Sequence, residues 1–320
     1  MKVILTGGAG FIGSHVCDHL IHALPDLHLV VLDRMTYAAD FRNLANVLLQ
    51  GHAKLVVGDV CDLTTCTEVT KGADVVVHLA AESHVDNSFG NSLHFTTTNV
   101  QGTHTLMEAC RINNVPRIVH VSTDEVYGEL ADGCSCDESA PLNPSNPYSA
   151  SKAAAEMIIR GYLASFGLPV IILRGNNVYG TRQYPEKIIP KFCMQLIRGK
   201  MLTVHGDGGN TRTFLAADDL ASALEIVLAR GEIGQVYNVG TSEEYANLSI
   251  AGMICEAFGV ECDRRVEFVE DRPFNDRRYS VNCAKIRALG WAPDRTLTGQ
   301  IDNIAQWYRD NAHRYAEVAF

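Results

Sequence analysis

The feature that most constrains the fold is a series of short apolar runs that alternate with amphipathic segments. Six runs rich in Val, Ile and Leu are bounded by turn residues and are expected to form strands at residues 2–5, 28–32, 54–57, 75–79, 117–121 and 169–173. Helical patterns lie between them, for example over residues 11–24 and 94–112. Strands that are apolar on both faces and alternate with helices are typical of a buried parallel sheet. The sequence therefore predicts an α/β fold built on a doubly wound parallel sheet.

The alternation changes after about residue 175. Segments 175–190 and 204–214 are rich in Gly, Asn, Pro and aromatic residues, as in ordered loops around a site. A helical pattern returns over residues 215–231. We expect residues 1–175 to form a Rossmann-type domain, with later segments crossing back into it. Residues 176–320 are expected to form mainly a smaller substrate-binding lobe.

Composition argues against several classes of partner. The chain has 320 residues and a formal net charge of −10, which argues against a nucleic-acid-binding or anionic-membrane surface. Its ten cysteines are scattered, without two pairs at zinc-ligand spacing, so we expect free thiols and no metal. No apolar run is long enough to span a membrane, and the N-terminal run is too short for a signal peptide. We therefore expect a cytoplasmic protein.

Three glycines, Gly7, Gly10 and Gly13, follow the first predicted strand and open the first predicted helix. Glycines allow a tight turn and a close approach to a pyrophosphate, which the helix N-terminus attracts. Asp33 ends the second strand twenty residues after Gly13, where a carboxylate can accept from both ribose hydroxyls and would repel a 2′-phosphate. The pattern predicts NAD as the cofactor, although the neighbouring Arg34 weakens the case against NADP. An ordinary strand–helix turn is the alternative.

Later strand ends are expected to complete the cofactor site. Residues 58–62 follow the third strand and would flank the adenine, and residues 79–83 follow the fourth and would lie along the cofactor. Besides the three glycines and Asp33, the expected cofactor-binding residues are Phe11, Ile12, Asp59, Val60, Leu79, Ala80, Ala81, Ser83, Asn99, Ser122, Tyr148 and Lys152.

Tyr148 and Lys152 lie four residues apart at the start of a predicted helix, and therefore on one face of it. A free tyrosine has a pKa of about 10, too high for a base at neutral pH. A neighbouring ammonium and a bound cationic nicotinamide would both lower that pKa. Tyr148 then becomes a candidate to move the proton of an alcohol. The alternative is an ordinary tyrosine and lysine on a helix surface.

Two adjacent carboxylates, Asp124 and Glu125, come just after the fifth predicted strand. In an α/β sheet the carboxyl ends of the strands open into the ligand crevice. Two carboxylates in a closed site repel each other, which raises the pKa of at least one. The pair is therefore a candidate for acid–base chemistry, and helix-capping or solvent-facing acids are the alternative.

Several motifs together resemble the nucleotide-sugar 4,6-dehydratases, which are extended short-chain dehydrogenase/reductase enzymes. The resemblance runs from residue 2 to about residue 310 and is carried by TGGAGFIG, STDEVYG, NPYSASKAAAE, QYPEKIIPKF, HGDG and DRPFNDRRY. The extended superfamily is marked by the glycine loop and YxxxK, and the dehydratase by the Thr-Asp-Glu triplet. Such enzymes act in deoxysugar biosynthesis, including that of rhamnose.

The resemblance implies a three-stage reaction on an NDP-glucose. Tyr148 would take the proton of the sugar 4-hydroxyl while C4 gives its hydride to NAD, with Lys152 lowering the tyrosine pKa and Thr123 bonding the oxygen. Glu125 would then remove the C5 proton while Asp124 protonates the departing C6 hydroxyl. The hydride would return at C6, giving an NDP-4-keto-6-deoxyglucose and oxidised cofactor.

The resemblance also implies substrate-binding residues. Arg212 and Arg272 would hold the diphosphate, Ser83 and His84 would touch the hexose, and Tyr279 would line the base or ribose end. The complete implied set is Ser83, His84, Thr123, Asn177, Lys191, Arg212, Asn247, Arg272 and Tyr279.

The QYPEKIIPKF and RPFNDRRY forms look more like uridine-linked than thymidine-linked enzymes. Bacterial thymidine-linked enzymes usually carry an RDWL-like run where residues 212–215 here read RTFL. UDP-glucose is therefore favoured over dTDP-glucose as the substrate. Because uracil and thymine differ by one methyl group, a pocket separates them only modestly.

Three other functions remain open. A UDP-hexose 4-epimerase shares the glycine loop and YxxxK but lacks the acid pair, and a UDP-glucuronate decarboxylase usually has a small polar residue at the position of Asp124. A non-catalytic NAD-sensing protein commonly loses the tyrosine or the lysine, and both are present here.

The segments 92–113 and 149–166 carry apolar positions beyond one core face. Relatives pair these helices, and the resemblance therefore implies a homodimer through a four-helix bundle.

Overall fold

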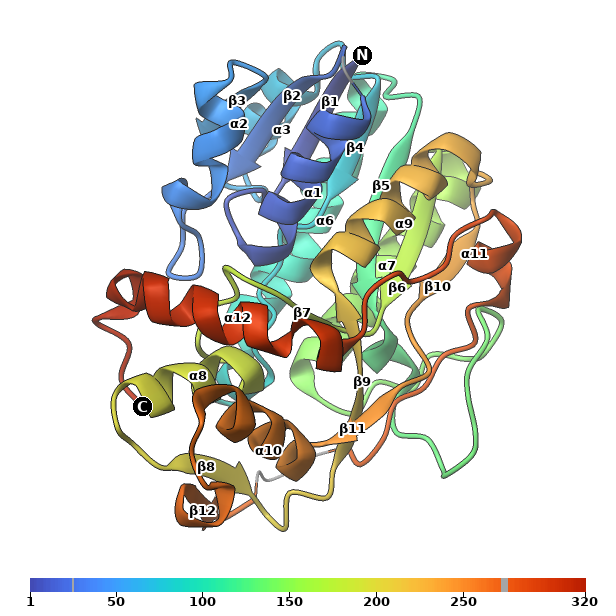
Figure 1. Ribbon diagram of the computed structural model, residues 1–320. Helices are drawn as coiled ribbons and strands as arrows, with labels where there is room; N and C mark the ends of the chain where they lie inside the picture. Colours follow the sequence, from blue (N-terminus) through green and yellow to red (C-terminus); the bar gives the residue numbers. More distant parts are fainter. Residues whose placement is uncertain (25, 272–275) are drawn as a thin grey trace.

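A seven-stranded parallel sheet forms the centre of the computed structural model, which describes residues 1–24, 26–271 and 276–320 (Figure 1). The strand order is β10-β6-β5-β4-β1-β2-β3. In chain order the strands are β1 (Lys2–Thr6), β2 (His28–Asp33), β3 (Ala53–Val57), β4 (Val75–His78), β5 (Ile118–Thr123), β6 (Val170–Gly175) and β10 (Val236–Val239). All pairs in this sheet are parallel. The predicted doubly wound α/β fold is confirmed.

The strand order reverses beside β1, whose neighbours are β2 on one side and β4 on the other. At such a switch point the connecting helices diverge to opposite faces and leave a crevice beyond the carboxyl ends of the strands. The glycine loop after β1 and the segment after β4 both open into this crevice.

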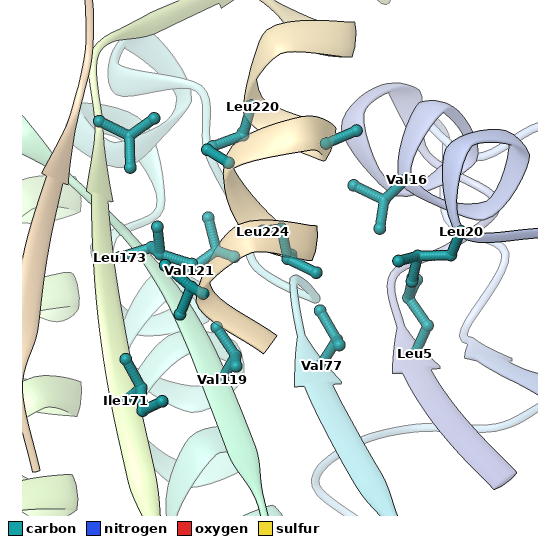
Figure 2. Close-up of a cluster of buried hydrophobic side chains, with 14 of the residues drawn as sticks. Leu5, Val16, Leu20, Val77, Val119, Val121, Ile171, Leu173, Leu220 and Leu224 are labelled. Carbon is teal, nitrogen blue, oxygen red and sulfur yellow. The ribbon is translucent and has the colours of Figure 1, made fainter. Parts of the chain in front are cut away.

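Helices cover both faces of the sheet because alternate strand residues point in opposite directions. The cluster on one face contains Leu5 with residues of α1 (Phe11–Ala23) and α9 (Ala217–Arg230). Ile4 belongs to the cluster on the other face, with residues of α3 (Leu63–Thr70), α6 (Gly102–Ile112) and α7 (Pro147–Phe166). Figure 2 shows the first cluster, in which Leu220 and Leu224 of α9 face side chains of β4 to β6.

A smaller lobe lies below the carboxyl edge of the sheet in Figure 1. Its strands form a three-stranded sheet, β11-β9-β7, and a two-stranded sheet, β12-β8. A separate apolar cluster, including Phe192, Ile254 and Tyr308, joins its helices. Its elements are β7 (Asn177–Tyr179), α8 (Ile188–Ile197), β8 (Leu202–His205), β9 (Thr211–Ala216), β11 (Glu244–Ala246), α10 (Asn247–Phe258), β12 (Val266–Val269) and α12 (Leu297–Asn311).

Three segments differ from the sequence prediction. The composition indicated ordered loops in two segments where the structure has strands β7 and β9 and the start of α8. The two strands were missed because their short β-forming runs are flanked by Gly and Asn. The single helix predicted over residues 94–112 is divided into α5 (Ser92–Phe95), a π-helical segment (Thr96–Gln101) and α6. The π segment places Asn99 in the interior, where it bonds the backbone of Glu82.

The remaining elements are short connections. Helices α2 (Ala45–Leu49), α4 (Val85–Gly90) and α11 (Ala284–Ala288) and the turns Phe41–Leu44, Asp124–Tyr127, Cys262–Arg264 and Ala312–Tyr315 complete the described chain. All ten cysteines are unpaired, as predicted. Within the described residues, no helix combines the length and apolar character needed to cross a membrane.

Candidate active site

The chain that leads from β1 into α1 is packed so tightly that Gly7 and Gly13 have no room for a side chain. Gly7 has a φ of +73°, and a Cβ there would lie 2.8 Å from the backbone of Ala80. A Cβ on Gly13 would lie 2.2 Å from the Gly7 carbonyl oxygen. A Cβ on Gly10 would meet only that same oxygen, at 3.4 Å. The loop is therefore closed toward the protein and open above Gly10, the N-cap residue of α1.

Asp33 fixes this loop from the end of β2. Its carboxylate accepts from the Ala9 amide at 2.9 Å and from the Met35 amide at 2.8 Å. Burial raises its pKa. Because a carboxylate has about four acceptor positions, these bonds leave capacity for a ribose. The neighbouring Arg34 pairs with Asp59 at 3.2 Å.

A cavity of about 390 Å³ runs from the glycine loop to the small lobe. Among the predicted site residues that the structure describes, the following line it: Gly7, Gly10, Phe11, Ile12, Gly13, Leu79, Ala81, Ser83, His84, Ser122, Thr123, Glu125, Tyr148, Lys152, Asn177, Lys191, Arg212, Asn247 and Tyr279. Those placed outside its lining are Asp33, Asp59, Val60, Ala80, Asn99 and Asp124. Arg272 lies outside the described residues.

The carboxyl pair lies at the turn that follows β5. The Thr123 hydroxyl accepts from the Glu125 amide at 3.3 Å and so caps the turn. Asp124 is 2% exposed and accepts at Oδ2 from Asn176 Nδ2 at 2.7 Å. At Oδ1 it accepts from the Thr123 hydroxyl at 3.3 Å. Asp124 is thus buried beside two residues that line the cavity.

Burial is the main cause of the altered acidity of this pair. It raises the pKa of Asp124 to about 7, and the charge of Glu125 adds to the rise. Burial also raises the pKa of Glu125, against the opposing charges of Lys187 and Arg212. The sequence predicted the direction from mutual repulsion, whereas desolvation makes the larger contribution in the structure. An acid with a pKa near neutrality suits proton donation.

Helix α7 positions Tyr148 and Lys152 through its first turn. Asn146 and Ser149 form a reciprocal capping box, and Pro147 occupies the first helical position. Lys152 Nζ donates to the Val121 carbonyl at 2.8 Å, and burial lowers the pKa of the lysine to about 8. In the chain alone burial and Glu125 raise the Tyr148 pKa. This differs from the predicted lowering, in which the charge of a bound nicotinamide also takes part.

Arg212 of β9 brings a positive charge to the other end of the cavity. Its guanidinium lies 4.9 Å from the centre of the Tyr279 ring and donates to the Thr211 carbonyl at 2.8 Å. The Tyr279 hydroxyl donates to Asp276, which also accepts from the Ser145 hydroxyl at 2.7 Å. Arg212 therefore supplies a positive charge to a cavity that also contains acidic side chains. An anionic ligand in that cavity would require such a charge.

Several site residues were missed by the sequence reasoning. Lys187 Nζ donates to the Ser83 carbonyl at 2.7 Å and joins the small lobe to the segment after β4. Glu186 accepts from the Tyr37 hydroxyl at 2.9 Å and lies 3.8 Å from His84 Nδ1. The other missed residues are Asn146, Asn176 and Asp276. Asn146 lies in the quoted NPYSASK motif, whose Asn-Pro start is a helix-capping signal.

The site fits a dinucleotide. The Ser122 hydroxyl is buried without a hydrogen-bond partner and lines the cavity, so a ligand there would meet an available polar group. No side chain caps the N-terminus of α1, and its first turn holds no acidic residue, which leaves amides facing the open side of the glycine loop. The described residues contain no cluster of three or more ligating side chains able to hold a metal ion.

Comparisons with known proteins agree with this geometry. The family described as "GDP-mannose 4,6 dehydratase" matches residues 4–304. A trifunctional UDP-glucose 4,6-dehydratase/3,5-epimerase/reductase of Arabidopsis thaliana is 46% identical, over 99% of this chain and 48% of that protein. The chain thus spans about half the length of the curated relatives it matches first. The dTDP-D-glucose 4,6-dehydratase of Homo sapiens is 40% identical, over 99% of this chain and 92% of that protein.

A solved structure is similar over the same length. The dTDP-glucose 4,6-dehydratase of Streptomyces venezuelae, crystallised with NAD, superimposes with a TM-score of 0.96 and 41% identity. The match covers 99% of both chains. The fold and the sequence therefore agree on the same group of enzymes.

Proposed function

The chain belongs to the nucleotide-sugar 4,6-dehydratases of the extended short-chain dehydrogenase/reductase superfamily, and we propose that it dehydrates an NDP-glucose to the NDP-4-keto-6-deoxyglucose. The resemblance predicted from the motifs is confirmed at the level of the family. The observation that carries the proposal is that a buried Asp124 and a half-buried Glu125 lie beside Tyr148, with the Asp124 pKa raised to about 7.

NAD is the proposed cofactor, and it would supply a hydride acceptor that later gives the hydride back. The open side of the glycine loop would hold its pyrophosphate, and Asp33 its adenosine ribose. Ser122 and Lys152 line the same cavity as Tyr148. The two groups thus offer a hydroxyl and an ammonium to the nicotinamide end.

Tyr148 is proposed to take the proton of the 4-hydroxyl. Its phenolate form is stabilised by hydrogen bonding from Thr123, and a cationic nicotinamide would stabilise it further. Glu125, which lines the cavity, would remove the C5 proton that the 4-ketone acidifies. Asp124 would protonate the C6 hydroxyl as it leaves. An acid and a base are thus available in one turn of chain.

The acid pair separates this proposal from its rivals. Epimerisation at C4 and decarboxylation at C5 expel no hydroxyl, so neither reaction needs an acid in the place of Asp124. In this chain a group with a pKa of about 7 lies there. Tyr148 and Lys152 are both present, which argues against a non-catalytic sensor of NAD.

Arg212 and Lys191 are the described cations proposed to face the diphosphate, with Asn177 and Asn247 as polar partners. All four line the cavity. UDP-glucose is the favoured nucleotide sugar. Its support is the QYPEKIIPKF and RPFNDRRY forms of two motifs together with the RTFL run.

Mass spectrometry of parallel reactions with UDP-glucose and dTDP-glucose tests the proposal. We expect loss of one water with NAD present in catalytic amount, and a higher rate with UDP-glucose. Loss of carbon dioxide from UDP-glucuronate, or conversion of UDP-galactose without water loss, would instead identify a decarboxylase or an epimerase. Equal or faster turnover of dTDP-glucose would refute the proposed preference for UDP-glucose but not the proposed dehydration.

A homodimer is also proposed, in which α7 and the helical segment from α5 to α6 form the interface. Apolar side chains are exposed there, with Leu93 79% and Phe166 58% accessible. Met157 on α7 is 45% accessible. Light scattering should give twice the chain mass, and Leu93→Glu should give a monomer.

The ten free thiols favour a reducing compartment, in keeping with a cytoplasmic location.

A further inference from the structure

Thr123 interacts with Asp124 and Tyr148, the two groups whose protonation the proposed reaction, on which this inference rests, leaves changed. Its hydroxyl donates to Asp124 Oδ1 at 3.3 Å, and its hydrogen bonding to the Tyr148 side chain acts to lower the pKa of Tyr148. The three side chains are 8%, 2% and 9% exposed, in the order Thr123, Asp124, Tyr148. A hydroxyl carries one hydrogen and can accept two. It can therefore receive a proton from one neighbour while giving its own to the other.

The proposed reaction leaves a proton imbalance between these neighbours. Tyr148 gains the proton of the 4-hydroxyl, and Asp124 loses its proton to the C6 oxygen. Glu125 takes the C5 proton and returns it to C5, so it ends unchanged. After one turnover Tyr148 therefore holds one proton too many and Asp124 one too few. Neither group is freely accessible to water.

The other contacts of Asp124 cannot correct this imbalance. Its Oδ2 accepts from the Asn176 amide nitrogen at 2.7 Å. The Asn176 carbonyl oxygen in turn accepts from the Thr241 amide at 3.1 Å, which fixes the orientation of the side chain. An amide held in this way donates but does not release its proton. Only Oδ1, the oxygen that faces Thr123, is left to carry the acidic proton.

We propose that Thr123 relays the proton that Tyr148 takes from the 4-hydroxyl to Asp124, so that it leaves in the water formed at C6. Asp124 Oδ1 gives its proton to the C6 oxygen, the C6–O bond breaks with its electron pair, and water departs. The Asp124 carboxylate accepts the Thr123 proton, and Thr123 takes the proton of Tyr148. The phenolate, the hydroxyl and the carboxylic acid are all restored without a proton from the solvent.

The relay predicts a difference between the first turnover and later ones when the hydroxyl is removed. Thr123→Val keeps the shape of the side chain, and Asp124 still begins protonated, so one product forms per site. Later turnovers wait for protons from solution. We expect a burst followed by a steady rate at least about tenfold lower. That steady rate should increase with the concentration of imidazole buffer, which supplies the proton.

Thr123→Ser is the matched control because it retains the hydroxyl. It and the wild type should show neither a burst nor a buffer dependence. Chemical quench with UDP-glucose or dTDP-glucose, whichever the wild type turns over, measures the burst. Equal first and later rates in Thr123→Val, at every buffer concentration, would overturn the relay.

A second measurement needs no turnover. Infrared titration of the Asp124 carboxyl band, identified by its loss in Asp124→Asn, reports the bond from Thr123. Removing that donor in Thr123→Val should raise the pKa of Asp124, and Thr123→Ser should leave it unchanged. An unchanged titration in Thr123→Val would refute the contact and the relay with it. If the wild type makes no dehydrated product from either sugar, the proposed function fails instead.

Discussion

Asn176 holds the carboxyl group of Asp124 in one orientation, with its Nδ2 2.7 Å from Asp124 Oδ2. A donated hydrogen bond stabilises the ionised form, so Asn176 lowers the pKa of Asp124. Burial acts more strongly in the opposite direction and raises that pKa to about 7. The balance leaves an acid that is partly protonated at neutral pH and still able to give up its proton.

Asn176→Ala should move the alkaline side of the pH–rate profile upward. An acid must be protonated to act, so activity falls as the pH rises through its pKa. A bond to a charged group is worth about 1.5–3 kcal/mol, which corresponds to a shift of about one pH unit or more. The pH dependence of kcat measures this. Asn113→Ala, whose side chain bonds Thr67 and Thr70 away from the cavity, should leave the profile unchanged.

Tyr148→Phe and Asp124→Asn should stop the reaction at different stages. Tyr148→Phe should slow C4 oxidation about 10²- to 10⁴-fold, so little reduced nicotinamide forms. Asp124→Asn should oxidise C4 but eliminate slowly, so reduced nicotinamide and the 4-keto sugar accumulate. Absorbance of the cofactor and mass spectrometry distinguish the two. Tyr162→Phe, on the same helix and bonded to Glu108, should behave as the wild type. Unimpaired turnover in Asp124→Asn would remove the acid assignment.

Asp124→Asn should also stabilise the fold as the pH rises. The Asp124 pKa is raised in the folded state from 3.8 to about 7, so the native state binds the extra proton between these values. The contribution of Asp124 to stability is therefore full below about pH 4 and is lost as the pH rises to about 7. Asparagine does not titrate, so the variant does not lose this part of the free energy of unfolding, which is at most about 4 kcal/mol. Urea unfolding at pH 5 and pH 8 should show a larger advantage of the variant at pH 8. An equal difference at both values would contradict the prediction.

Gly13→Ala should abolish binding of NAD. A Cβ would lie 2.2 Å from the Gly7 carbonyl oxygen, so the loop must open and its amides must move. Titration calorimetry with NAD measures the loss. Gly161→Ala is the matched control, because a Cβ there meets nothing within 4 Å in helix α7. It should bind NAD normally and raise stability by about 0.5–1 kcal/mol.

Glu156→Gln should strongly destabilise the fold. Glu156 and Arg174 are both completely buried and pair at 2.6 Å, so the change leaves an uncompensated buried charge. Removing one partner of such a pair costs about 3–5 kcal/mol. Urea denaturation provides the measurement. Glu108→Gln, which breaks the exposed pair with Arg111, should change little. Similar losses in both variants would show that burial does not decide the effect.

The main sheet could be predicted because each of its first six strands is a continuous apolar run. Strand β10 was missed: its four residues, VYNV, form a short run that includes a polar residue and depends on the edge of β6. The π-helical turn at Thr96–Gln101 was also missed, because nothing in the spacing distinguishes it from α-helix. Its cause is tertiary, since Asn99 bonds Glu82 and Ser151.

The candidate site was only partly predictable for the same reason. Residues in contiguous motifs, such as Tyr148 and Glu125, could be found from spacing and from the position of the strand ends. Asn176 and Asp276 are positioned by hydrogen bonds to Asp124 and Ser145, which lie 52 and 131 residues away in the chain. Local pattern contains no such information. Asp33 was found for its expected bond to a ribose, whereas the structure adds its bonds to the glycine loop.

The return of α9 and β10 to the main sheet limits how such an enzyme can be modified. A fragment that ended at residue 175 would lack the neighbour of β6 and the helix that covers Leu5 and Val119. The two lobes are therefore not exchangeable modules with one junction, and neither is expected to survive a simple transplant. New sugar specificity is more accessible through single substitutions in the cavity lining than through recombination of whole lobes.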